Sequence, residues 1–128
     1  MDYKGFQEYR TQQEQSINTM TQCELLLLLY DELVKRLVRA ELALGKENFT
    51  LFEESVDRSL DIIFYLDTTL DHQYEISANL TRLYEFFSYE LCRVKAGRNK
   101  TELERVKTMV SELRDSFREA QKTSDPGR

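Results

Sequence analysis

Apolar residues recur three and four positions apart along four stretches of the chain, separated by short polar connections. This spacing returns to the same face of an α-helix. We predict helices over residues 21–44, from 48–50 to about 70, over 76–97, and from 101 to about 121. Short connections favour antiparallel neighbours, so the predicted fold is all-α, an antiparallel four-helix bundle.

The expected helix ends also follow from the sequence. Thr21, Thr50 and Thr101 are each followed three residues later by a glutamate, the spacing of a capping box at a helix start. Gly45 and Gly97 suit the residue that ends a helix. The bundle domain is therefore expected over residues 21–121.

The first predicted helix carries more apolar surface than one core face can use. Residues 25–30 are five leucines and a tyrosine, and successive helical residues lie about 100° apart. Leu26 and Leu29 fit the stripe that faces a core, whereas Leu25, Leu27 and Leu28 do not. The second and third helices carry similar groups off their stripes. Such a surplus predicts a groove for an amphipathic helix of a partner; the alternatives are a homodimer surface or isolated exposed residues.

The 20 residues before the bundle are polar but carry Tyr9 and Ile17 among other apolar groups. Two interpretations are equally open: a disordered terminus, or a partly flexible arm that lies on the bundle. We expect residues 122–128 to form a disordered tail.

Charge and composition narrow the function. The chain has 18 Lys and Arg against 23 Asp and Glu, mixed along its length, so we expect neither nucleic acid nor a membrane as a partner. The N-terminus lacks the apolar region of a signal peptide, and no apolar run is long enough to span a bilayer. A cytoplasmic protein with Cys23 and Cys92 reduced is expected.

The sequence contains no pattern typical of a catalytic centre. Its only histidine, His72, falls in a predicted turn, and the Glu-x-x-His pairs of a di-iron bundle are missing. No phosphate-binding loop or activated nucleophile is found. We expect no cofactor, no metal and no enzymatic activity.

Three segments resemble the flagellar secretion chaperone family FliS. Residues 17–31, INTMTQCELLLLLYD, are similar to the family's Val-x-Thr-Ala-Ser-Pro segment followed by Glu-Leu and Leu-Tyr-Asp-Gly. Residues 76–84 resemble the start of its third helix and residues 113–120 its final helix, with Phe117 where the family often has Trp. Thr21 and Gln22 replace the usual Ser-Pro, and Glu32 replaces the Gly after Tyr-Asp.

The resemblance implies a bundle that binds the C-terminal segment of newly made flagellin in the bacterial cytoplasm. It also implies that this binding prevents premature polymerisation and assists delivery to the flagellar export apparatus. In the family the N-terminal arm can cover part of the binding surface. We expect a monomer or weak homodimer. The candidate contacts are Tyr9, Ile17, Leu25, Leu27, Leu28, Tyr30, Val34, Ile62, Tyr65, Tyr84, Phe86 and Tyr89.

Overall fold

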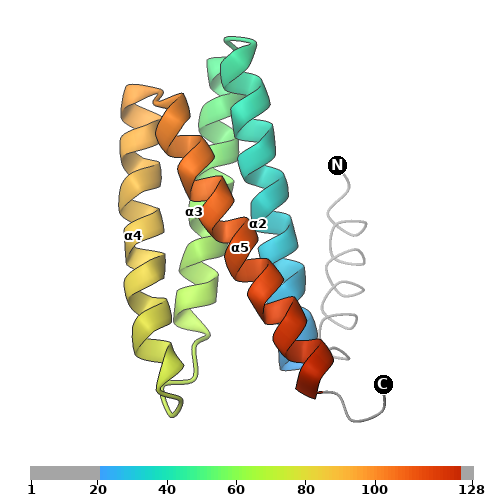
Figure 1. The fold of residues 1–128 in the computed structure, drawn as a ribbon. Coiled ribbons are helices and arrows are strands. Elements are labelled where there is room, and N and C mark those ends of the chain that lie inside the picture. The colour runs from blue at the N-terminus through green and yellow to red at the C-terminus, as the bar shows by residue number, and fades with distance from the viewer. Residues whose placement is uncertain (1–20, 125–128) are drawn as a thin grey trace, which may run out of the picture.

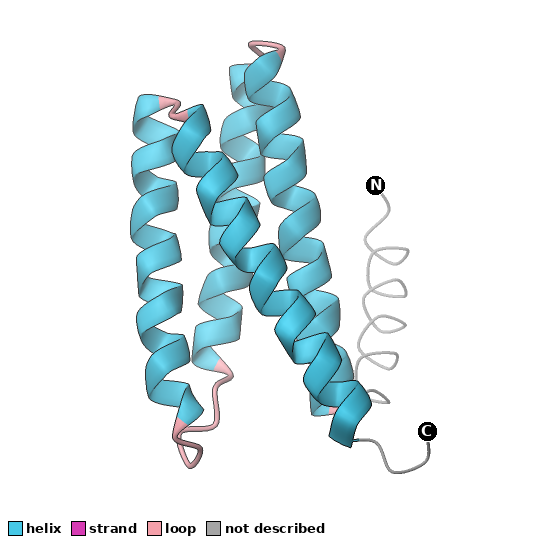
Figure 2. Cartoon of the chain, in the orientation of Figure 1, coloured by secondary structure: helices cyan, strands magenta, loops and turns pink. Residues whose placement is uncertain are grey.

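The computed structural model describes residues 21–124, with side chains described through residue 122. It contains α2 (Gln22–Gly45), α3 (Phe49–Thr68), α4 (Ile76–Gly97) and α5 (Lys100–Ser124). This part of the chain consists of helices and short loops without a strand (Figure 2). The predicted all-α bundle is confirmed, and its last helix runs three residues past the expected end. The predicted arm and residues 125–128 lie outside the described range.

Two of the three predicted threonine caps are wrong. Thr21 does cap α2, since its hydroxyl accepts a hydrogen bond from the Glu24 backbone N–H at 3.1 Å. The caps of α3 and α5 are instead Asn48 and Asn99, whose side-chain oxygens accept from the backbone N–H three residues on. Asparagine is among the best N-cap residues, so each helix starts at the earlier cap and includes the predicted threonine.

The predicted glycine stops are also placed differently. Gly45 and Gly97 are the last residues of α2 and α4, and neither has a positive φ. The left-handed conformation is found at Glu47, with φ of 57°, and at Arg98, with φ of 52°. The Arg98 guanidinium lies over the Phe49 ring, 3.6 Å from its centroid, which holds the α4 end against α3.

The helices form a ring in the order α2, α3, α4, α5, and each packs on its neighbours in the chain, while α5 also closes onto α2. α5 crosses the bundle diagonally, from the end of α4 toward the start of α2 (Figure 1). The α4–α5 contact is therefore smaller than the α2–α5 contact. Apolar residues from all four helices form one core.

Two tyrosines in the centre of this core correct the sequence analysis. Tyr30 and Tyr84, expected at the partner surface, are fully buried, and their hydroxyls hydrogen-bond to each other across the bundle. Burial, followed by the proximity of Tyr84, raises the pKa of Tyr30 well above its ordinary range. Tyr30 also stacks on Phe117 of α5, with ring centroids 5.5 Å apart. Each hydroxyl thus finds a partner without leaving the core.

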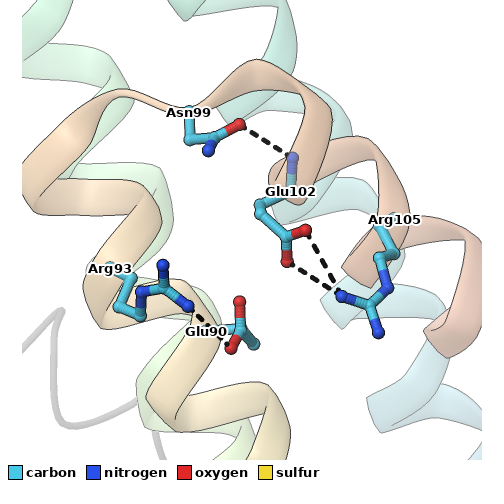
Figure 3. A network of polar contacts seen from close by, with 5 residues as sticks. All are labelled: Glu90, Arg93, Asn99, Glu102 and Arg105. Carbon is cyan, nitrogen blue, oxygen red and sulfur yellow. Dashed lines mark hydrogen bonds and ion pairs between the residues drawn. The ribbon is translucent and has the colours of Figure 1, made fainter.

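A polar network holds the α4–α5 corner (Figure 3). Glu90 of α4 is only 6% exposed and pairs with Arg93 at 3.4 Å. Hydrogen bonding, including two contacts from Arg105 at 3.3 Å, lowers the pKa of the Glu102 carboxyl on α5. Asn99 caps the same turn. This corner therefore brings two carboxyl groups together between two arginines.

Candidate partner-binding surface

Two stripes of residues line the outer side of the contact between α2 and α3, which we call the α2–α3 seam. On α2 the stripe consists of Leu25, Leu28, Glu32, Arg36 and Arg39. On α3 it consists of Leu51, Ser55, Arg58, Ile62 and Tyr65. Each stripe has the three- and four-residue spacing of one helix face. Members of both stripes line a shared hollow of about 320 Å³, which shows that the two faces adjoin.

The leucine-rich end of this seam is apolar. α2 and α3 are antiparallel and joined by a short turn, and the hollow places Arg36 beside Arg58. Counting away from the turn at equal rise puts Leu28 close to the level of Tyr65, Leu25 about one turn further from the α2–α3 connection, and Ile62 about one turn nearer to it, opposite Glu32. These four residues are named here the apolar end. Leu28 and Tyr65 are each 44% exposed, and the other two are half-buried.

The leucine run therefore divides as the sequence analysis predicted. Leu26 and Leu29 pack against the core. Leu28 is exposed, and Leu25 lies beside it on the seam stripe. Leu27 and Val34 are half-buried on another face of α2. Leu27 lies four residues before Asp31 and Val34 three residues after it, so both share the face of Asp31, which pairs with Arg118 of α5. They lie on the α2–α5 side.

The remaining predicted contacts do not join the apolar end. Tyr30 and Tyr84 fill the core. Phe86 is half-buried with Arg105 of α5 over its ring, 5.4 Å from the centroid. Tyr89 is 63% exposed on α4 beside Arg93. Tyr9 and Ile17 are outside the described residues.

Sequence reasoning missed part of this surface. The apolar end continues along both stripes to Arg36, Arg39 and Arg58 and to the exposed Leu51. The continuing three- and four-residue spacing was the available signal, but it becomes visible only once α2 and α3 are known to be neighbours. Phe64, 70% exposed, was also absent from the predicted contacts.

The side chains of this surface are aliphatic, aromatic and charged groups. Within residues 21–122, no cluster of three or more His, Cys, Asp or Glu side chains could hold a metal ion. None of the described helices is long and apolar enough to cross a membrane. Hydrocarbon and aromatic side chains beside charged ones at a helix–helix groove suit an amphipathic partner segment.

The family model for flagellar protein FliS matches residues 5–124. The chain belongs to the FliS family. The flagellar secretion chaperone FliS of Bacillus subtilis (strain 168) is 28% identical over 112 residues, covering 88% of this chain and 84% of that protein. Membership of the FliS family, expected from the three sequence segments, is confirmed.

The fold of this FliS-family chain is shared with a solved structure. A crystal structure of a flagellar chaperone from bacteria matches with a TM-score of 0.77, over 94% of this chain and 99% of that chain. The sequence identity is 16%, so this similarity shows the fold alone. The helical bundle is thus retained with few identical residues.

Proposed function

We propose that this chain is a cytoplasmic export chaperone that binds the C-terminal segment of flagellin. The proposal is carried by the apolar end of the α2–α3 seam, where the exposed Leu28 and Tyr65 lie with the half-buried Leu25 and Ile62 on a member of the FliS family. Large side chains that a small domain leaves outside its core mark an interaction site.

The apolar end gives such a chaperone a simple physical mechanism. A client segment that is disordered before assembly buries its own apolar face when it folds onto a groove. While that face is covered, it is not available for polymerisation with other client molecules. Binding alone accounts for this activity, so we propose no catalytic step, cofactor or metal. Release would occur at the flagellar export apparatus.

The arm supplies a further element of the proposal. We propose that Tyr9 and Ile17, in the segment before α2, cover part of the apolar surface when no client is bound. The arm leads directly into Thr21, close to Leu25 and Leu28 in sequence. Client and arm would then compete for the same leucines, and the measured client affinity would rise when residues 1–20 are removed.

Calorimetric titration with flagellin from the same genome tests the proposed function. Intact flagellin is expected to bind, and flagellin lacking its C-terminal segment is not. Binding that is unaffected by this truncation would contradict the proposed mode. Light scattering at several concentrations separates a client-binding monomer from a homodimer that uses the same face.

The Leu28→Asp variant tests the position of the site. We expect at least a tenfold loss of flagellin affinity, because a charge is placed in an apolar contact, at a stability change of about 0.5 kcal/mol or less. Leu42→Asp is the matched control, since Leu42 is exposed on the same helix but off the seam stripe. Equal losses in both variants, or a collapse of folding in Leu28→Asp, would refute this placement.

A further inference from the structure

Cationic side chains connect three of the four seams of the bundle. Arg118 of α5 pairs with Asp31 of α2 at 3.2 Å, and Lys95 of α4 pairs with Asp57 of α3 at 2.8 Å. Arg105 of α5 lies over a phenylalanine ring of α4. These cations help to hold neighbouring helices together.

The arginines of the α2–α3 seam make no such cross-helix contact within residues 21–122. Arg36 pairs with Glu32 one turn earlier on α2, at 3.2 Å. Arg58 pairs with Asp61 on α3 at 3.7 Å, and both of these side chains are largely exposed. Arg39 is exposed and makes no ion pair or hydrogen bond with any other residue of the described range 21–122. Exposed pairs within one helix contribute little stability, so these arginines are poorly explained by folding.

The same three arginines line the hollow of about 320 Å³, which lies nearer to the α2–α3 turn than the apolar end does. Its wall also includes Leu51, Ser55 and one acidic residue, Glu54. Three arginines and one glutamate thus line the hollow, in a chain whose net charge is −5, while Glu32 and Asp61 pair with two of these arginines along their own helices. We call this part of the seam the arginine end. The residues that line the hollow carry a net positive charge, and Arg39 is the arginine among them that has no carboxylate partner within residues 21–122.

We propose that the arginine end binds carboxylate side chains of the same partner segment whose apolar residues occupy the apolar end. The inference rests on the proposed function and adds the chemistry of the client: an amphipathic segment with an acidic cluster beside its apolar stripe. Guanidinium groups suit this task because they form paired hydrogen bonds to carboxylates.

The geometry fixes the spacing that the partner needs. Leu28 and Arg39 are separated by 11 positions on α2, which corresponds to about 16 Å along a helix axis. A helical segment lying along the seam would therefore carry its acidic side chains about three turns from its apolar contacts. The α2–α3 seam would bind the apolar and the acidic side chains of one segment at the same time. It would disfavour a segment that has basic residues in place of the acidic ones.

Two synthetic peptides of about 18 residues test the inference on the full chain. Both have the same apolar stripe; one carries glutamates at both ends and the other lysines, so binding orientation does not matter. We expect the acidic peptide to bind at least tenfold more tightly in low salt, with the preference shrinking as salt is added. Equal affinities, or no binding of the acidic peptide, would overturn the inference.

Charge reversal locates the effect. The double variant Arg39→Glu with Arg58→Glu is expected to abolish or invert the peptide preference. Arg82→Glu with Lys100→Glu is the control, because both residues are exposed outside the seam and the net charge changes equally. If the control pair abolishes the preference as well, the effect belongs to the overall charge and the inference fails.

Titration of the same variants with flagellin separates this inference from the proposed function. Flagellin binding that is weakened by Leu28→Asp but unchanged by the arginine reversal would leave the function standing and remove the inference. Failure of flagellin to bind the parent chain, together with a retained preference for the acidic peptide, would remove the function and support an acidic partner of another identity.

Discussion

Two groups of large side chains on α2 and its neighbours contrast sharply. Tyr30 and Tyr84 carry polar hydroxyls and yet lie fully inside the bundle, whereas the hydrocarbon side chain of Leu28 is 44% exposed. A ranking by hydrophobicity alone would reverse this placement. The tyrosines can be buried because each hydroxyl satisfies the other.

The contrast shows that the position of a side chain relative to the neighbouring helices, and not its hydrophobicity alone, decides whether it lies in the core or at the surface. Tyr30 precedes Leu33 and Leu37 by three and seven residues, so it continues their inward-facing line. Leu28 falls on the stripe that borders α3 from outside. Folding fills the first position, whereas the second stays at the surface, where we propose that a partner binds.

The largest loss of stability is expected when a buried tyrosine side chain is truncated. Tyr84→Ala removes a buried ring and leaves the Tyr30 hydroxyl without its partner, which should cost about 3–5 kcal/mol of unfolding free energy. Urea denaturation followed by circular dichroism measures it. Tyr89→Ala, one turn and a half further along α4 and exposed, should cost less than about 1 kcal/mol. Similar losses would show that the two positions are equivalent.

A smaller effect should come from removing the hydroxyls alone. Tyr30→Phe and Tyr84→Phe should each cost about 1–3 kcal/mol, because one buried hydroxyl is left unpaired. The double variant should cost less than the sum of the two, since it leaves no unpaired group. A double-mutant cycle in urea gives the coupling, and strict additivity would mean that the hydroxyl pair contributes nothing.

The smallest effect concerns the polar pair at the α4–α5 corner. Hydrogen bonding, including two contacts from Arg105 at 3.3 Å, lowers the pKa of Glu102 in the folded protein, so this carboxylate stabilises the fold above its ordinary pKa of 4.5. That contribution is lost as pH falls through the lower, folded value. Glu102→Gln should therefore lower the urea midpoint at pH 7 and match the parent chain in acid. Glu112→Gln, on the same helix and exposed, is the control, and a pH-independent difference would refute the assignment.

Much of the fold could be predicted because helices are encoded locally. The four helices, the division of the leucine run and the Thr21 cap follow from spacing within single segments. The caps at Asn48 and Asn99 were missed because an earlier side chain competed with a recognised capping box. The burial of Tyr84 and the arginine end depend on which helices become neighbours, and no single segment contains that information.

The stacking of Phe117 on Tyr30 has a consequence for synthesis of the chain. Tyr30 is made before its ring partner Phe117, and Asp31 is made 87 positions before its partner Arg118. Until α5 is complete, the nascent α2–α3–α4 unit exposes the side of the core that α5 covers. During translation this protein must avoid aggregation, because α5 closes onto α2 only after α3 and α4 have been made.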